Sequence, residues 1–349
     1  MDSYDTGKTA VAAAGSTAVK RKVAWSSYAA RFRELGLLFF IVLLCMIIQL
    51  RNPSFLTWDN IQDLVNNTAI LSILSVGMMM VIITRGIDLS VGAILALSGM
   101  ISAMTVSEYP GTPPMLALLL GAVIGIVCGS IIGFLVSKMD LLPIIATLGM
   151  MNVYRGLTYL ISDGSWVSAH QMSEAFKKLG TGTWLGISYL VWFAVLVYVI
   201  AYYFITHTRT GRQIYAVGSN PEAARISGIQ MNRILWLVYA ILGGLSGMAG
   251  VLWVAKFASA QGDTATGYEL SVIAACVVGG VSIAGGVGKL SGVLLGAILL
   301  GIINNALPLI NVSPFWQMGI QGAIILAAVL INAVIKRGVD RTHLMRRNI

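Results

Sequence analysis

Ten long apolar runs constrain this chain of 349 residues more than any other feature. A helix needs about 20 mostly apolar residues to cross the roughly 30 Å hydrocarbon core of a bilayer. Only 11% of the residues are charged, and the mean hydropathy is +0.83, whereas soluble domains carry about 25% charged residues. We therefore expect an all-α, polytopic membrane protein with ten transmembrane helices, at residues 35–50, 68–84, 89–107, 115–137, 141–161, 186–206, 233–255, 268–284, 290–307 and 317–335.

The positions of the lysines and arginines predict the orientation of these helices. Basic residues accumulate in cytoplasmic loops. Of the 23 Lys and Arg, one lies within a predicted span, at Arg155, and all but four of the others fall on one side of the membrane. The four exceptions are Arg51, Lys177, Lys178 and Lys256. Both termini are therefore predicted to be cytoplasmic.

The ends of the chain differ in composition from the apolar middle. Residues 1–34 are polar and rich in small residues, so we expect a largely disordered cytoplasmic head. Residues 35–335 form the predicted transmembrane domain, and residues 336–349 form a basic cytoplasmic tail. The net charge of +9 comes from residues that flank the spans. This arrangement gives no basic face for nucleic acid, which we exclude as a partner.

The chain lacks the residue patterns of an enzyme or a metal site. Its three histidines lie in separate loops or the tail, and its three cysteines lie within apolar runs, so no ligand set for a metal is predicted. No acidic residue lies in the middle of a span. The segment 286–290 lacks the serine or threonine that a nucleotide-binding Walker A motif requires. We therefore expect a transporter rather than an enzyme, with no bound cofactor.

The scarcity of charge within the spans also bears on how transport is driven. Ion-coupled carriers keep ionisable groups inside the membrane. This chain offers only Asp88, at the end of a span, and Arg155. The pattern favours a driving force supplied by another subunit, and an ion-coupled secondary carrier is the alternative.

A polar break separates the second and third predicted spans, from Thr84 to Ser90. One interpretation is an element of the substrate pathway, with Arg85 and Asp88 forming an ion pair and Ser90 exposed to the substrate. The other is a short solvated turn in which Asp88 caps the next helix. Arg155 has two interpretations as well. It contacts a substrate, or it extends to the membrane interface in a structural role.

Two amides, Asn304 and Asn305, follow one another on the ninth predicted span. Amides offer hydrogen-bond donors and acceptors without a charge to desolvate, which suits a neutral polyol in the pathway. Hydrogen bonding between helices explains them equally well.

The inner loop, residues 207–232, holds the clearest local signal. Within it, Gly211–Ile229 is predicted to form a short amphipathic helix. Pro221 suits a first helical turn, Glu222 complements the positive end of the helix dipole, and Gly228 can end the helix. This helix is interpreted as a surface for a cytoplasmic partner, with a helix lying on the membrane surface as the alternative.

Small residues recur at intervals of four on several spans. Such stripes allow two helix backbones to approach closely. We expect them to mark tight packing within the bundle, at Gly121, Gly125, Gly129 and Gly133, at Gly243 and Gly247, and at Gly292 and Gly296.

Several segments, taken in order, are similar to the permease subunit of ribose-type ABC sugar importers, over about residues 35–332. They are Gly86–Gly92, Ile145–Met151, Gly211–Ile229, Gly267–Leu270 with Val278–Gly280, Asn304–Asn305 and Gln317–Met318. Glu222, Ala223, Ala224 and Gly228 resemble the signature by which importer permeases contact their ATPase. Asp88 and Ser90 lie in the family's GIDLS segment, and residues 306–317 resemble the branch that serves rhamnose or autoinducer-2.

This resemblance implies a ten-helix permease of the bacterial inner membrane that carries a monosaccharide or related polyol inward. It implies an ABC ATPase subunit that binds the ATP, a second permease chain and an extracytoplasmic sugar-binding protein as partners. The implied substrate pathway includes Asp88, Ser90, Arg155, Asn304 and Asn305, and the ATPase-coupling residues are the four of the inner loop. An ion-coupled secondary sugar carrier remains the alternative.

Overall fold

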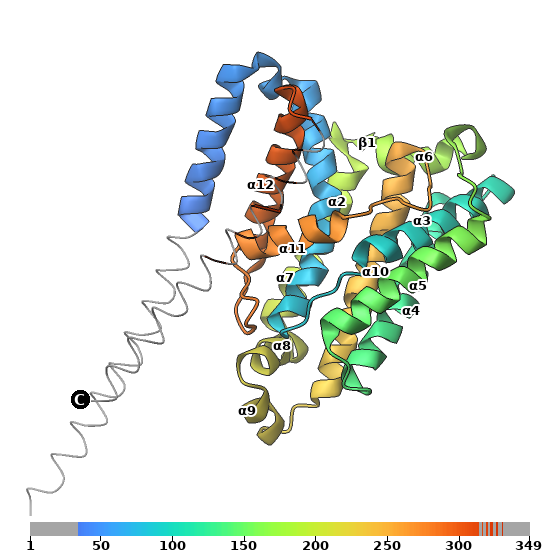
Figure 1. Cartoon of the computed structure of the whole chain (residues 1–349). Helices are drawn as coiled ribbons and strands as arrows, with labels where there is room; N and C mark the ends of the chain where they lie inside the picture. The colour runs from blue at the N-terminus through green and yellow to red at the C-terminus, as the bar shows by residue number, and fades with distance from the viewer. Residues whose placement is uncertain are drawn as a thin grey trace, which may run out of the picture.

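The computed structural model describes residues 34–313 and, beyond them, positions 316, 319, 322, 323, 326 and 330. The predicted head up to residue 33, most of the tenth predicted span and the basic tail at 336–349 lie outside the described residues. Figure 1 shows the described part as a bundle of long helices.

The described helices follow one another with short connections. In chain order they are an unlabelled helix Glu34–Arg51, η1 (Pro53–Leu56), α2 (Trp58–Ile83), α3 (Val91–Glu108), α4 (Pro114–Ser137), α5 (Pro143–Ser162), η2 (Ala169–Gln171), α6 (Glu174–Thr181), α7 (Tyr189–His207), α8 (Arg209–Ser219), α9 (Pro221–Ile226), α10 (Met231–Phe257), α11 (Tyr268–Val278) and α12 (Leu290–Leu309). The two short strands, β1 (Thr183–Trp184) and β2 (Ile187–Ser188), form an antiparallel hairpin between α6 and α7. Eight of the described helices are long and apolar enough to cross a membrane, which agrees with a polytopic all-α protein.

The predicted span 268–284 is wrong in its length. Its helix, α11, has 11 residues and ends before Gly279, so at about 1.5 Å per residue it covers only half of the hydrocarbon core. Gly280 has φ +92°, a left-handed conformation that a helix cannot continue through. Residues 279–289 therefore form a loop between α11 and α12.

The inner loop contains two helices rather than the single predicted one. The chain leaves the helical conformation at Asn220, with φ −147° and ψ 96°, between α8 and α9. Pro221 then occupies the first position of α9, as expected from its fixed φ.

The glycine stripe of α4 lies against α10. A Cβ atom added to Gly125 would lie 2.1 Å from the carbonyl oxygen of Gly243, and one added to Gly247 would lie 2.0 Å from that of Gly121. No side chain fits between these backbones. The same holds between α11 and α12, where a Cβ added to Gly296 would lie 2.1 Å from the carbonyl oxygen of Ala275. The prediction of tight packing at these stripes is confirmed.

The first described helix, Glu34–Arg51, packs at the edge of the bundle (Figure 1). Its Ile41 and Ile48 belong to a small apolar cluster with Leu299 and Ile302 of α12. The carboxylate of Glu34 lies 3.4 Å from Nζ of Lys289, at the start of α12. This helix is therefore attached mainly to α12.

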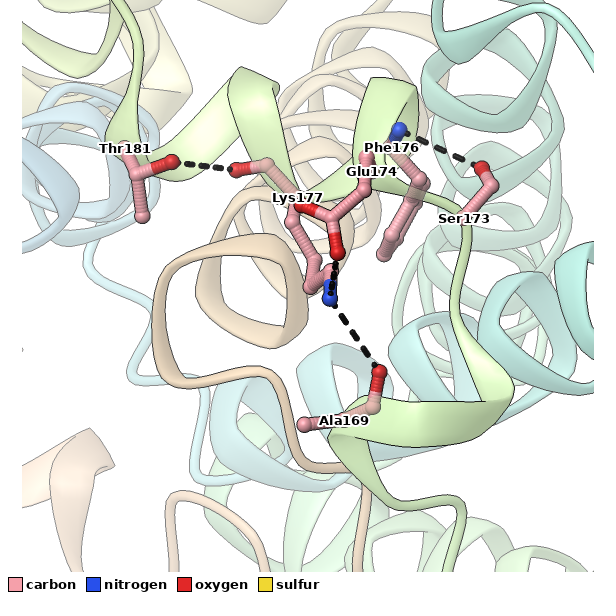
Figure 2. A network of polar contacts seen from close by, with 6 residues as sticks. All are labelled: Ala169, Ser173, Glu174, Phe176, Lys177 and Thr181. Atoms are coloured by element: carbon pink, nitrogen blue, oxygen red, sulfur yellow. Dashed lines mark hydrogen bonds and ion pairs between the residues drawn. The ribbon is translucent and has the colours of Figure 1, made fainter.

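The two ends of the bundle carry different elements, as Figure 1 shows. Helices α8 and α9 lie at one end, called here the α9 end, and α6 with β1 lies at the other, called the α6 end. Helix α6 packs on the bundle through Phe176, which is fully buried. A polar network, drawn in Figure 2, joins α6 to η2: Nζ of Lys177 contacts the Glu174 carboxylate at 2.5 Å and donates to the carbonyl oxygen of Ala169. The backbone nitrogen of Phe176 donates to Oγ of Ser173, which caps the helix.

Candidate functional site

Two polar residues of the break between α2 and α3 are buried inside the bundle. Asp88 is 1% exposed and Ser90 is fully buried. The Oδ1 atom of Asp88 accepts hydrogen bonds from the backbone nitrogen of Ser90, at 2.7 Å, and from its hydroxyl, at 2.6 Å. The other carboxylate oxygen, Oδ2, has no hydrogen-bond partner among the residues that the structure describes. Neither interpretation of this segment holds as stated. Asp88 and Ser90 are not solvated as a surface turn requires, and Ser90 is not exposed as the pathway interpretation requires, although Arg85 is exposed and Asp88 does accept a bond at the start of α3.

Arg85 turns away from Asp88 toward α8. Its Nε donates to the carbonyl oxygen of Gly218 at 2.7 Å, and its Nη2 donates to that of Ser219 at 3.0 Å. Carbonyl groups at the end of a helix carry partial negative charge, so a guanidinium is a favourable partner for them. The suggested ion pair between Arg85 and Asp88 is not formed.

The end of α8 is wedged between α2 and the loop 279–289. A Cβ added to Gly218 would lie 1.8 Å from the carbonyl oxygen of Ile83, the last residue of α2. That same oxygen accepts a hydrogen bond from the backbone nitrogen of Gly286 at 2.9 Å. The hydroxyl of Tyr215 donates to the carbonyl oxygen of Gly288 at 2.8 Å, and burial raises the pKa of this phenol, which keeps it a donor. Helix α8 is therefore fixed to two interior segments at once.

Helix α9 presents most of its residues to solvent at the α9 end. Glu222 lies exposed in its first turn, whereas the side chain of Asn220 caps the helix by accepting from the nitrogen of Ala223 at 3.1 Å. Ala224 is buried against the bundle and Ala223 is exposed. The helix ends before Gly228, which has φ +78°, as its predicted role in the turn requires.

Helix α9 also exposes one large apolar residue, Ile226, that was not among the predicted coupling residues. Its side chain is 87% exposed on a helix of six residues. A large apolar side chain held in solvent on a rigid helix end suits insertion into a partner's pocket. The signal in the sequence was one bulky apolar residue in an otherwise polar or small-residue segment.

Arg155, on α5, contacts the backbone of a loop rather than the membrane interface. Its Nη1 donates to the carbonyl oxygens of Gly262, at 2.9 Å, and Thr264, at 2.7 Å. The loop 258–267 then reaches the start of α3, where a Cβ added to Gly92 would lie 2.5 Å from the carbonyl oxygen of Ala265. Arg155 thus attaches this loop to α5, a structural contact that differs from the predicted extension to the membrane interface.

The two amides of α12 have different surroundings. Asn305 and Asn60 of α2 exchange two side-chain hydrogen bonds, at 2.9 and 3.0 Å, so both amides hold the helices together. Asn304 lines a cavity of about 190 Å³ beside the end of α10, the helix that packs against α6. The other lining residues come from α2, α10, α11 and α12, and they are Asn67, Ile70, Leu71, Trp253, Phe257, Tyr268, Gly301 and Asn305.

Aromatic rings and amides form the wall of this cavity, called here the amide–aromatic cavity. The ring of Trp253 lies 5.0 Å from that of Tyr268, edge to face, and 4.9 Å from that of Phe257. The ammonium group of Lys256 donates to the amide oxygen of Asn67 at its rim. Ligand pockets for drug-sized molecules measure about 300–1,000 Å³, so this smaller cavity suits a small molecule that stacks and forms hydrogen bonds.

Comparison with known proteins identifies the family of the chain. Residues 60–329 match the family model BPD_transp_2, described as the permease component of the branched-chain amino acid transport system. No solved structure matches the chain.

Three curated relatives show the same relationship over most of their length. The chain is 40% identical over 294 residues to the ribose import permease protein RbsC of Escherichia coli (strain K12), covering 84% of this chain and 91% of the relative. It is 42% identical over 301 residues to RbsC of Bacillus subtilis (strain 168), covering 86% of this chain and 92% of the relative. It is 33% identical over 324 residues to the L-arabinose transport system permease protein AraH of E. coli (strain K12), covering 93% and 97%.

These matches exclude the ion-coupled secondary carrier, because the relatives are permease components of ABC importers. They also place the chain in the inner membrane, in agreement with its apolar helices. The family model and the relatives together show that this chain belongs to the permease subunits of ribose-type, binding-protein-dependent ABC sugar importers.

Proposed function

We propose that this permease carries a monosaccharide of the pentose class, and that the sugar passes through the amide–aromatic cavity. The names of the relatives support the substrate class, since they import ribose and L-arabinose. The cavity supports the route, because aromatic rings stack on the apolar faces of sugars while amides bond to hydroxyls. In this proposal Asn304 contacts the sugar, and Asn305 acts through its bond to Asn60.

The coupling to ATP hydrolysis is proposed to run through α8 and α9. A chain without a nucleotide site receives work from a partner, here an ABC ATPase docked on α9 at Glu222, Ala223, Ile226 and Gly228. The observation that supports this most strongly is the attachment of Arg85 to the end of α8, at 2.7 and 3.0 Å. If α9 and the end of α8 move, the two bonds to Arg85 would transmit the movement to the segment 84–90, which contains Asp88.

The loop 279–289 provides a second route from α8 into the bundle. It is held to the end of α2 by Gly286 and to α8 by Tyr215. When the ATPase subunits close, α8 would shift both this loop and the break 84–90. Asp88 and Ser90 lie immediately before α3, and Gly92 of α3 touches the loop that Arg155 holds. The movement would therefore alter the route between the two ends of the bundle. This is a mechanical basis for alternating access.

The orientation that follows places the α9 end in the cytoplasm and the α6 end outside. In this proposal α11 and the loop 279–289 cross the membrane together as the eighth segment, from Tyr268 beside α10 to Gly286 beside α8. With residues 317–335 as the tenth span, both termini are then cytoplasmic, the head comprises residues 1–34 and the tail residues 336–349. The sugar-binding protein docks at the α6 end, where Figure 2 shows polar side chains on α6. A second permease chain, identical or related, completes the transmembrane unit beside the lipid.

ATP-driven uptake into proteoliposomes tests this proposal. Vesicles that contain the permease and its ATPase, with binding protein supplied on one side, should accumulate labelled ribose or L-arabinose only when ATP is present. A mixture that lacks the permease is the control. Uptake without ATP, or uptake driven by a sodium or proton gradient, would contradict the proposal.

A further inference from the structure

A second cavity, of about 1,010 Å³, lies between the end of α4, helix α9 with the residues after it, and the start of α10. None of the residues assigned to sugar transport or to ATPase docking lines it. The lining residues are Phe134, Ser137, Lys138, Asp140, Arg225, Ile229, Gln230, Met231, Asn232, Arg233, Leu235 and Trp236.

Three cations face this cavity without a partner for their charges. The side chains of Lys138, Arg225 and Arg233 are exposed, and none forms a hydrogen bond or ion pair within the described part of the chain. Asp140 is the one acidic residue among the lining residues. The described lining of the cavity therefore carries a net positive charge, which favours an anionic ligand or partner.

The backbone adds further donors to the same cavity. The first residues of α10 line it, and no side chain caps this helix or places a carboxylate in its first turn. The N-terminus of a long helix with free N–H groups attracts anions. Ser137, at the end of α4, also lines the cavity; it is 3% exposed, and its hydroxyl has no hydrogen-bond partner among the described residues. Cations, free amides and a buried hydroxyl thus converge on one space.

The remaining wall of the cavity is apolar. Phe134 is 51% exposed and Trp236 is 40% exposed, on the sides of α4 and α10 that lead into the bundle's apolar surface. A free inorganic anion or an acidic protein surface gains nothing from such a wall. A phospholipid can contact both walls, because its phosphate binds the cations and its acyl chains pack against Phe134 and Trp236.

We infer that this cavity binds the headgroup of an anionic phospholipid of the cytoplasmic leaflet, between α4, α9 and α10. The inference rests on the proposed orientation, which places the α9 end in the cytoplasm. Because Arg225 belongs to α9, a bound lipid would contact this helix and restrict its movement, and the ATPase is proposed to dock on the same helix. Bound phosphatidylglycerol therefore stabilises the permease and supports its coupling.

Lipid binding to the purified full-length permease tests this inference directly. Native mass spectrometry would measure phosphatidylglycerol against phosphatidylcholine, and thermal unfolding would follow the stabilisation. Lys138→Gln with Arg233→Gln should weaken binding of phosphatidylglycerol about fivefold for each cation removed, as expected for basic residues near an anionic leaflet. Arg209→Gln with Arg212→Gln is the matched control, because these exposed cations lie at the same end but outside the cavity. The control should bind as the wild type does.

The other outcomes each overturn the inference in a distinct way. Equal lipid binding by wild type and by the Lys138/Arg233 variant would show that the cavity is not a lipid site. Equal stabilisation by inorganic phosphate would identify a site for a free anion. Loss of ATPase co-purification with unchanged lipid binding would assign the cavity to the ATPase. The lipid-binding measurement does not depend on transport. A failure of the proposed sugar transport would therefore not contradict the lipid-binding inference.

Discussion

The Nε atom of Arg85 donates a hydrogen bond to the carbonyl oxygen of Gly218 across 2.7 Å, joining two segments 133 residues apart. One segment is the buried break that begins α3, and the other is the end of α8, next to the helix exposed at the α9 end. The pair connects the surface of the permease to its interior. It also explains why Arg85 does not balance the charge of Asp88.

Labelling of introduced cysteines should separate the two ends of the bundle. Ser165 and Ser227 are both exposed, at the α6 end and the α9 end respectively. In intact spheroplasts an impermeant thiol reagent should label Ser165→Cys and leave Ser227→Cys unlabelled until the membrane is permeabilised. The wild-type chain, whose Cys128 and Cys276 are buried, gives the background. The reverse pattern would contradict the proposed orientation.

Changes on α9 should abolish the association with the ATPase while leaving the fold intact. Glu222→Lys places a positive charge against the positive end of the helix dipole, and Ile226→Ser removes an apolar side chain that is 87% exposed. Exposed positions contribute little to stability, so the thermal midpoint should stay near the wild-type value. Co-purification of the ATPase should fall at least tenfold.

The matched control for these variants is Glu174→Lys, which makes the same charge change at an exposed position of α6. It should keep the ATPase bound. Wild-type co-purification by both α9 variants would show that the ATPase docks elsewhere.

The two amides of α12 should respond differently to removal. Asn304→Ala should raise the apparent KM for the sugar about fivefold, the effect of losing one hydrogen bond worth about 1 kcal/mol. Asn305→Ala breaks the reciprocal pair with Asn60, so it should lower the thermal midpoint and leave KM nearly unchanged. Asn152→Ala, on the exposed face of α5, is the control for both. If Asn304→Ala lowered the thermal midpoint and left KM unchanged, the proposal that Asn304 contacts the sugar would be contradicted.

A methyl group at the α4–α10 contact should destabilise the bundle. Gly125→Ala would place its Cβ 2.1 Å from the carbonyl oxygen of Gly243, and such overpacking costs about 1–3 kcal/mol. Gly149→Ala, at a helical position on α5 with nothing within 4 Å, should be neutral or slightly stabilising because alanine favours the helix. Thermal unfolding of both purified variants measures the difference. Equal thermal midpoints of the two variants would mean that α4 and α10 can move apart without a loss of stability.

The apolar runs predicted most of the membrane helices because each span has to satisfy its own backbone within the bilayer. The glycine stripes predicted the α4–α10 packing, since only small residues allow that approach. The short length of α11 was missed because Gly279 and Gly280 lie within an apolar run, whose hydropathy says nothing about backbone conformation.

Contacts between distant residues could not be predicted in the same way. A solvated turn and a buried break can have the same local sequence, so the sequence could not decide whether Asp88 is buried. The pairing of Asn305 with Asn60 joins residues 245 positions apart, and no local pattern selects one amide partner over another. The roles of Arg85 and Arg155 depended equally on carbonyl groups far along the chain.

The ratio of sugar transported to ATP hydrolysed, measured for Arg85→Gln, tests the central claim most directly. The glutamine keeps a polar side chain but cannot make both bonds to the carbonyl oxygens of Gly218 and Ser219. The variant importer, reconstituted with its ATPase and binding protein, should assemble normally and hydrolyse ATP. It should move at least tenfold less sugar per ATP than wild type and than the Arg212→Gln control. An unchanged ratio would contradict the claim that this contact carries movement from α8 and α9 to the sugar pathway.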